Sequence, residues 1–170
     1  MGDAPPIDRA QALELIRSGS AIGADMRGVD LSGADLSGAR LSHANLSGAN
    51  LSGANLRETI LDEADLRDAN LSDANCELAI LGGADVSGAD FSRANLQRAN
   101  LVGAKGHRAR FDNARMYYSR PGNADFQGAS FRGADITRAI FRRANLKNAD
   151  LRGADGQANF ENAVLDGVQR

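Results

Sequence analysis

Tryptophan is absent from this sequence, and aromatic residues make up only 5% of its 170 residues. The core must therefore consist of small and medium side chains, which indicates a narrow interior. Cys76 is the only cysteine, so the chain has no internal disulfide and fits a reducing compartment. No run of 18 apolar residues is present, which argues against a membrane-spanning helix.

The opening segment MGDAPPIDRAQ lacks the basic stretch and the apolar run of a secretory leader. Gly2 does not open a myristoylation motif, because Pro6 stands where serine or threonine is usual. We therefore expect a cytoplasmic protein that makes no membrane contact.

A five-residue repeat dominates the rest of the chain. With unit centres at every fifth residue from 26 to 156, there are 27 units, and 24 of the centres are apolar. Two positions before the centre, 24 of the 27 residues are alanine. A period of five fits neither a helix nor a strand, but it fits a chain that turns a corner once per unit. Each unit then sends one large and one small side chain inward.

The remaining positions of each unit face solvent. Glycine recurs two positions after the centre, as at Gly33, Gly38 and Gly48, where a type II turn requires a positive φ. Units with Asn, Asp, Arg or Glu at this position are expected to use another turn type. Asp or Asn precedes the centre in 18 of 27 units, and their side chains are expected to bond the local backbone at each corner.

The A(D/N)Lxx signature in ADLSG, ANLSG, ANLSD and ANLQR resembles the pentapeptide repeat protein family. The resemblance covers residues 21 to 168. It implies an all-β fold, a right-handed quadrilateral parallel β-helix with four units and 20 residues per coil, and about seven coils. At the usual strand spacing of about 4.8 Å the rod is roughly 35 Å long.

Other residues predict the register and the two ends of the rod. Phe91, Phe111 and Phe131 are 20 residues apart, as a ladder of stacked rings would require. Asp8 and Gln11 form a capping box before a helical segment that ends at Gly19. We therefore divide the chain into an N-terminal segment with a capping helix, residues 1–20, and a β-helix, residues 21–170. After Ala154 the register slips by one residue, and nothing resembles the C-terminal dimerisation helix of gyrase-protecting members of the family.

No catalytic constellation is visible in the sequence. His43 and His107 fall on different faces of a four-sided coil, so they do not form a metal or acid–base site. Cys76 occupies a core centre and is interpreted as an apolar filler. No GxxxxGK[ST], GxGxxG or HExxH motif is present. We expect no enzyme activity, no cofactor and no catalytic or metal-binding residues.

Departures from the repeat are the candidate functional positions, and the first group lies on the fourth face, whose centres are residues 41, 61, 81, 101, 121 and 141. Isoleucine replaces Asp or Asn before three of these centres, which favours a contact surface, with self-association as its form. The alternative is that β-branched residues simply suit a stacked β surface. The candidate apolar patch comprises Ile60, Leu78, Ile80, Val102 and Ile140.

The second group is the segment AKGHRARFDNARMYYSRPGN, residues 104–123. A base precedes the centre in all four of its units, so a basic belt is expected around one coil. Gly106 and Pro121 replace core side chains, and the sequence leaves open whether the segment forms a regular coil, a locally loosened coil or a loop. The candidate partner-binding residues are Lys105, Arg108, Arg110, Arg115, Tyr117, Tyr118 and Arg120.

The charges are distributed unevenly along the rod. Residues 1–103 carry 8 basic and 15 acidic residues, and residues 104–157 carry 11 basic and 5 acidic residues. This asymmetry favours either head-to-tail self-association or binding of an acidic partner by the basic half. Mixed charge on a solvated rod is the alternative that requires no partner.

Three functions remain open. The first is a rigid protein–protein interaction or structural module with a protein partner, which includes a homodimer. The second, implied by the family resemblance, is a DNA mimic that binds and protects DNA gyrase, but Arg27 and Arg67 interrupt its acidic row of Asp25, Asp65 and Asp85. The third is a weak nucleic-acid binder through residues 104–123, which the net charge of −2 disfavours.

Overall fold

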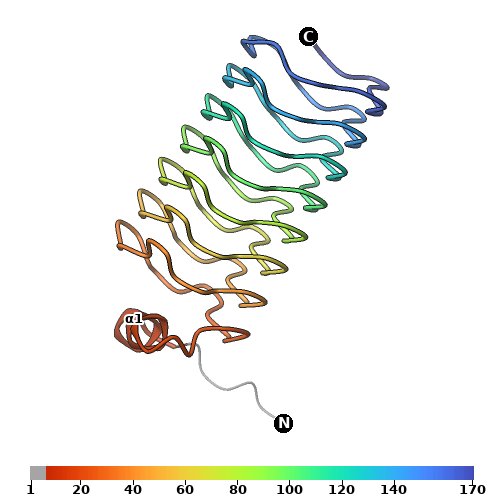
Figure 1. The fold of residues 1–170 in the computed structure, drawn as a ribbon. Helices are drawn as coiled ribbons and strands as arrows, with labels where there is room; N and C mark the ends of the chain where they lie inside the picture. The colour runs from red at the N-terminus through yellow and green to blue at the C-terminus, as the bar shows by residue number, and fades with distance from the viewer. Residues whose placement is uncertain (1–6) are drawn as a thin grey trace.

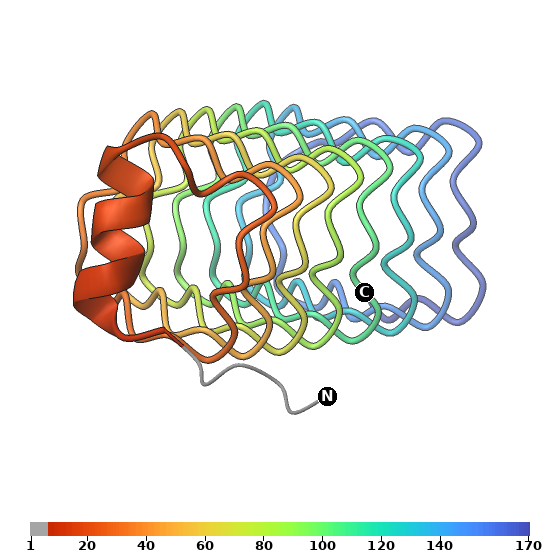
Figure 2. The same cartoon turned by 90° about the horizontal axis from the view of Figure 1, so that it is seen from below.

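The computed structural model describes residues 7–170, so the first six residues, with Gly2 and Pro6, lie outside the described part of the chain. A helix, α1 (Arg9–Arg17), lies at the N-terminal end of a stack of coils (Figure 1). Seen from below, the coils have a four-sided outline, and α1 lies along one side of the N-terminal coil (Figure 2). Within residues 7–170, no helix has the length and hydropathy needed to cross a membrane.

The helix α1 begins at a capping box and packs on the first coils. The Asp8 carboxylate accepts a hydrogen bond from the Gln11 N–H at 2.8 Å, and the Gln11 side chain accepts one from the Asp8 N–H at 2.9 Å. Ala12 is fully buried, and Leu15 and Ile16 pack against the core. The Arg9 guanidinium donates to two backbone carbonyls of the first coils, which ties the helix to the end of the stack.

Parallel bridges between residues 20 positions apart hold the coils together. They run in four series, as in the series Asp25–Asn45, Asn45–Asp65 and Asp65–Asp85, and each involves the residue before a centre. The Leu61 N–H donates to the Ile80 carbonyl at 2.7 Å, and the Ile80 N–H donates to the Thr59 carbonyl at 2.9 Å. The described strands are therefore single bridging residues rather than longer segments, and four of them make one coil.

Every corner of the regular repeat up to the slip has a positive φ two positions after the centre, so the expectation of another turn type in units without glycine is wrong. Glycines two positions after the centre have a positive φ, as at Gly33 with 63°, but sixteen non-glycine residues also have positive φ, between 54° and 60°. The i to i+3 bond from the Ala44 N–H to the Leu41 carbonyl is 3.0 Å across such a corner at His43. Bonds to the coils on either side hold these residues in a conformation that they rarely adopt in isolation.

The Asp and Asn residues before the centres bond the local backbone, as expected. The Asp30 carboxylate accepts a hydrogen bond from the Ser32 N–H at 3.0 Å, and the side-chain amide oxygen of Asn70 accepts one from the Ser72 N–H at 3.0 Å. Asn side chains also donate to the preceding coil, as from Asn55 to Asp35 at 2.9 Å. The repeated polar residues therefore have a structural role in the turns.

Residues 104–123 form a regular coil, so of the alternatives that the sequence leaves open the segment is neither loosened nor looped out. Gly106 is buried, and a Cβ there would lie 2.4 Å from the Phe126 ring, so the ring of the next coil fills its place. Pro121 is itself buried. Pro121 has no N–H to donate, and the Arg120–Ile140 bridge is missing between otherwise bridged neighbours. The register nevertheless continues, because the Ile140 N–H donates to the Ser119 carbonyl at 3.0 Å.

Phenylalanine rings form the predicted ladder in the core. Phe91 and Phe131 each stack on Phe111, with ring centroids 5.1 and 4.9 Å apart. The predicted slip near the C-terminus is also present, since the last bridges join residues 19 positions apart, as in Ile140–Asn159. Gly156 lies at the slip with φ 92°, and a Cβ there would collide with the Thr137 backbone. The coils on either side of the slip remain in contact, because Phe160 stacks on Phe141.

The Gly106–Phe126 contact gives a test of the core register. We expect Gly106→Ala to lower the free energy of unfolding by about 1–3 kcal/mol, because its methyl group overpacks the space that Phe126 fills. Phe126→Leu removes part of the ring and makes room for that methyl group. The double variant should then cost less than the sum of the single variants in urea unfolding followed by circular dichroism. Additive costs would show that the two residues do not share one core position.

Candidate functional site

The basic belt lies on four different faces. The bridges place Lys105 beside Asp125, Arg110 beside Ser130 and Arg115 beside Asp135, on successive sides of the coil. Arg110 is also partly neutralised, because its guanidinium lies 3.5 Å from Asp90 and 3.4 Å from Asp112. A partner that approaches from one side therefore contacts only part of the belt.

Part of the belt gathers at the corner between the fourth face and the third face, whose centres include residues 76, 96, 116 and 136. Tyr117, Tyr118 and Arg120 lie there, and Arg98 and Arg138 join them from the adjacent coils. The Tyr117 and Tyr118 rings are perpendicular, with centroids 4.6 Å apart. The Arg138 guanidinium lies 5.2 Å from the centre of the Tyr118 ring and donates to the Tyr118 hydroxyl. We call these five residues the Arg–Tyr corner.

Arg98 and Arg138 were not among the residues singled out from the sequence. Arg98, Tyr118 and Arg138 occupy the same position in three successive coils, 20 residues apart. The 20-residue spacing was therefore the signal that could have identified them. Within its own unit each of these arginines is an ordinary solvent-facing turn residue, so a single unit does not distinguish it.

The Arg–Tyr corner encloses an open groove of about 600 Å³ lined by Leu78, Arg98, Tyr117, Tyr118 and Arg120. Among the described residues, the guanidinium groups of Arg98 and Arg120 have no carboxylate within ion-pair distance. Both tyrosines are exposed. The groove thus presents two uncompensated cations beside two aromatic rings, which is a combination suited to an acidic ligand.

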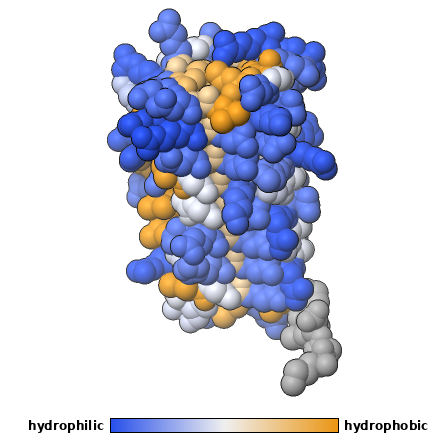
Figure 3. Space-filling view, turned by 90° about the vertical axis from the view of Figure 1, so that its right-hand side faces the viewer, coloured by the Kyte–Doolittle hydropathy of each residue, from blue (hydrophilic) through white to orange (hydrophobic). Residues whose placement is uncertain are grey.

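The apolar patch lies on the adjoining fourth face. Ile60 and Ile80 are bridged neighbours, and Leu78 lies at the corner beside Ile80. Ile80, Val102 and Ile140 are each 38% exposed. Val102 and Ile140 line one shallow groove with Arg120 and Gly122, so Ile140 stays on the isoleucine face. Figure 3 shows apolar areas on a largely hydrophilic surface, including one near the C-terminal end.

The last coil also exposes apolar residues. Val164 is 44% exposed, and Phe160, Leu165 and Val168 are only partly buried against the core. This end of the stack is a second candidate contact surface.

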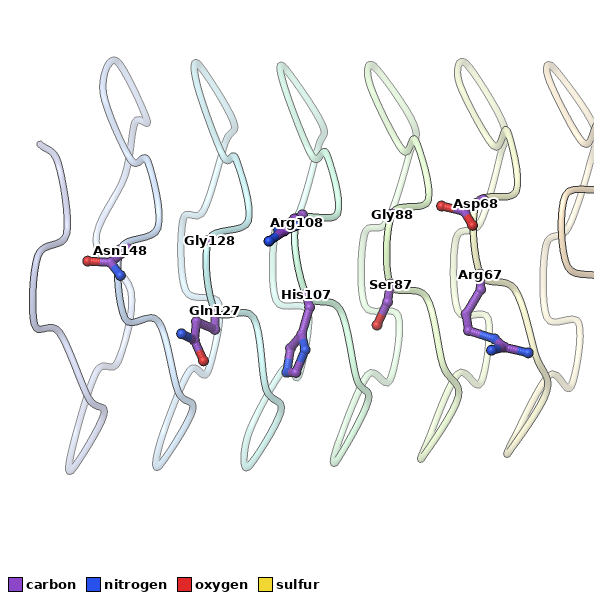
Figure 4. A pocket seen from close by; sticks show the side chains of 9 residues that line it. All are labelled: Arg67, Asp68, Ser87, Gly88, His107, Arg108, Gln127, Gly128 and Asn148. Atoms are coloured by element: carbon purple, nitrogen blue, oxygen red, sulfur yellow. The ribbon is translucent and has the colours of Figure 1, made fainter.

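A different groove runs along the corner after the first face, whose centres are residues 26, 46, 66, 86, 106, 126 and 146. Nine residues from successive coils line its volume of about 580 Å³, and Gly88 and Gly128 leave gaps between them (Figure 4). Arg67 is paired with Asp65 at 2.5 Å, and His107 lies 2.8 Å from Asp125. Arg108, one of the residues predicted to bind a partner, lies in this groove and away from the Arg–Tyr corner.

Cys76, His43 and His107 do not come together in a reactive cluster. Cys76 is fully buried, and burial raises the pKa of its thiol to about 12, so the thiol is protonated at neutral pH. His43 lies 3.4 Å from Glu63, on a different face from His107. Across residues 7–170, no group of three or more His, Cys, Asp and Glu side chains has a geometry suited to a metal ion.

Two of the three carboxylates in the acidic row of the first face are paired with neighbouring arginines. Arg27 forms bonds of 2.7–3.1 Å with both oxygens of Asp25, and Arg67 pairs in the same way with Asp65. These side-chain hydrogen bonds lower the pKa of Asp25 and of Asp65. The first face therefore carries two ion pairs rather than a continuous acidic row.

Comparison with known proteins settles the family. The sequence model of pentapeptide repeats matches eight copies, over residues 19–48, 49–88, 86–120 and 122–155. The chain belongs to the pentapeptide repeat family. Its stack of bridged coils is the β-helix of that family. A comparison with curated proteins found no significant match.

Solved structures of other pentapeptide repeat proteins are similar to this one. QnrB1, a plasmid-mediated fluoroquinolone resistance protein, is 24% identical over 88% of this chain and 83% of its own, with a TM-score of 0.56. A protein of the Arabidopsis thaliana thylakoid lumen is 33% identical over 73% of this chain and 72% of its own, with a TM-score of 0.41. HetL from the cyanobacterium Nostoc, involved in regulating heterocyst differentiation, is 25% identical over 96% and 94%, with a TM-score of 0.37. The similarity to QnrB1 supports the fold alone.

The buried position of Cys76 predicts its reactivity. In the folded pentapeptide repeat protein we expect an aromatic disulfide reagent to modify Cys76 at a rate at least about a hundredfold below that of the urea-unfolded chain, because the thiol is enclosed and protonated. The absorbance of the released thiolate measures both rates. Equal rates would show that the thiol is accessible and would reopen its role as a nucleophile.

Proposed function

We propose that this pentapeptide repeat protein is a non-enzymatic, rigid interaction module of the cytoplasm. In this proposal a right-handed quadrilateral β-helix, capped by α1, binds an acidic surface of a protein partner through the Arg–Tyr corner. The observation that carries the proposal is the gathering of two uncompensated guanidinium groups and two exposed tyrosines in one groove.

Two physical arguments support a protein partner. Tyrosine and arginine are the residues that most often dominate binding energy at protein interfaces, because they combine apolar area with directional hydrogen bonds. The corner is also preorganised, since Arg138 fixes the Tyr118 ring and bonds to both neighbouring coils fix the backbone. A rigid corner loses little conformational entropy when it binds.

Partner capture with charge-reversed variants tests the proposal. We expect Arg98→Glu with Arg120→Glu to reduce recovery of the bound proteins at least about tenfold in a pull-down from the source organism, because two attractive charges become repulsive. Glu58 and Glu63 occur naturally at the same turn position as Arg98, so the variant retains the turn. Nuclease treatment of the lysate separates protein capture from capture through nucleic acid.

Lys147→Glu is the matched control, because Lys147 is exposed and directly follows a centre of the first face, so the repeat places it at the corner diagonally opposite the Arg–Tyr corner. Its recovery should match that of the wild-type protein. Equal recovery by all three proteins would remove the Arg–Tyr corner as the binding site.

The gyrase-protecting DNA mimic is the second candidate function, and the similarity to QnrB1 in fold is what favours it. A mimic must present rows of carboxylates in place of phosphates, yet Arg27 and Arg67 pair with Asp25 and Asp65 on the first face. The basic half of the rod opposes an extended acidic surface. We therefore place this function below the interaction module.

A supercoiling assay separates the two functions. We expect no change in DNA gyrase supercoiling, with or without a quinolone, even at high excess of this protein, because its acidic rows are neutralised locally. Relief of quinolone inhibition at stoichiometric protein would support the mimic and contradict this ranking.

A further inference from the structure

We propose that the acidic partner of the Arg–Tyr corner presents a linear peptide segment, which crosses the fourth face and inserts one apolar side chain into a hollow at Gly122. The inference rests on the proposed function, because it starts from the same corner, and it states the chemistry of the partner. It follows from two adjoining grooves that share Arg120.

The hollow lies where an outward position of the coil has no side chain. Val102 and Arg142 occupy the same position as Gly122 in the coils before and after it, one residue after a centre of the fourth face. Gly122 is buried although both of those residues are exposed, which places it at the floor of a groove of about 220 Å³. A cavity of about 150 Å³ already holds a benzene-sized group. The hollow is therefore large enough for one apolar side chain.

Apolar side chains stand beside the hollow. Val102 and Ile140 are each 38% exposed, and both line the groove with Gly122. An aliphatic group placed between them removes apolar surface from water on both sides. A small anion would use the neighbouring cations but not these side chains, so the ligand that fits the whole groove carries an apolar group as well as acids.

Guanidinium groups lie on both sides of the hollow along the coil direction. Arg120 joins the hollow to the Arg–Tyr corner and to Arg98, and Arg143 lies at the corner after the fourth face. Among residues 7–170, Arg143 has no carboxylate within ion-pair distance, and Arg142 lies 3.6 Å from Glu161. No acidic residue lines either groove. The complementary segment therefore carries carboxylates before and after its apolar side chain.

An unpaired backbone acceptor lies beside the hollow. In the preceding coil of this face, the Leu101 N–H donates to the Arg120 carbonyl at 3.1 Å. Pro121 has no N–H, so within the described part of the chain no backbone donor bonds to the Ile140 carbonyl. This oxygen lies 3.7 Å from the position that a Cβ of Gly122 would take, so a donor in the hollow is within reach of it. A peptide carries a backbone N–H beside each side chain, whereas the phosphates of a nucleic-acid backbone carry no such donor.

One extended segment covers both the corner and the hollow. Residues 117–123 run from the tyrosine pair through Arg120 to the hollow, along a single coil. At about 3.3 Å per residue, a peptide of at most about seven residues spans this path. The fourth face is one narrow side of the rod, too small for a standard interface of about 800 Å² per partner. A short linear segment uses such a groove well, since pockets for single side chains supply its specificity.

Filling the hollow tests the inference in fluorescence anisotropy titrations of the full chain. The probe is a fluorescein-labelled peptide, EETLTEE, with one leucine between glutamates. We expect Gly122→Val to raise its dissociation constant at least about fivefold, because the new side chain occupies the space that the leucine needs. The variant suits the fold, since Val102 occupies the same position and a Cβ at Gly122 would come no closer than 3.4 Å to its neighbours.

Gly82→Val is the matched control. Gly82 occupies the same position of the same face two coils earlier, and a Cβ there would meet only the Val102 carbonyl, at 3.8 Å. This variant should bind the probe as the wild-type protein does. Thermal melting monitored by circular dichroism checks that both variants are folded.

A second peptide, EETGTEE, tests whether the leucine and the hollow form one interaction. It should bind the wild-type protein at least about fivefold more weakly than EETLTEE does, and it should bind the Gly122→Val variant with the same affinity as the wild type. Losses that add up would place the leucine elsewhere and contradict the inference.

Charge reversal tests the far side of the hollow. We expect Arg143→Glu to weaken binding of EETLTEE at least about fivefold, because an attractive charge becomes repulsive. Glu63 occurs at the same turn position with a positive φ, so the variant retains the turn. Lys147→Glu should bind the probe like the wild-type protein, and the peptide KKTLTKK should not bind.

Three outcomes would overturn the inference. Equal binding of EETLTEE by the wild type and the Gly122→Val variant would remove the hollow from the site. A single-stranded thymidine oligonucleotide that binds more tightly than EETLTEE, and loses binding in the Gly122→Val variant, would assign the groove to nucleic acid. Failure to bind the peptide, together with self-association that Gly122→Val abolishes, would assign the groove to a second copy of the chain.

The outcomes for the inference and for the proposed function differ. If reversal of Arg98 and Arg120 abolishes partner capture while Gly122→Val changes neither capture nor peptide binding, the proposed function stands and the inference fails. If reversal of Arg98 and Arg120 leaves capture unchanged, the proposed function fails, whatever the peptide titrations show.

Discussion

Backbone hydrogen bonds between residues 20 positions apart are the constraint on which the rest of the structure depends. They join every coil to the coils above and below, as from Leu61 to Ile80 and from Ile80 to Thr59. Because a bridge fixes the register, the alanines and apolar centres of successive coils must stack in the same interior. The outward side chains are then arranged in straight rows whose composition the sequence can change without changing the fold.

Because the interior is constrained in this way, the outward positions are where the composition of the chain is freest to vary. Many charges are compensated within the rod, as Arg93 is by Asp73 in the preceding coil and Arg152 by Asp150 in its own coil. The Arg–Tyr corner differs because Arg98 and Arg120 lie beside tyrosines and the apolar Leu78 rather than beside carboxylates. An uncompensated charge next to exposed apolar area is more readily explained by an absent partner than by stability of the isolated chain.

Much of the fold followed from spacing alone, and the errors have physical causes. The ring ladder of Phe91, Phe111 and Phe131 was predictable because identical residues recur once per coil. The space at Gly106 was misjudged because a ring from the next coil, Phe126, fills it, and a one-dimensional pattern does not show contacts between coils. The turn type was misjudged because neighbouring coils hold residues such as Leu78 at a positive φ that short-range propensity disfavours.

The candidate site was predicted only in part for a related reason. Tyr117, Tyr118 and Arg120 stood out within one coil, whereas Arg98 and Arg138 belong to the adjacent coils and look ordinary in their own units. Conversely, Arg110 stood out but is engaged by Asp90 and Asp112. Departures from the repeat thus identify unusual residues within one coil. Which of these residues share a corner with residues of the adjacent coils is seen only in the stacked structure.

Small-angle X-ray scattering of the wild-type protein over a range of concentrations tests the central claim most directly, namely that the fourth face is a contact surface. Self-association through this face predicts that the cross-sectional radius of gyration rises with concentration while the maximum dimension hardly changes. A maximum dimension that doubles at constant cross-section would show association through the ends of the rod. It would contradict the role assigned to the fourth face.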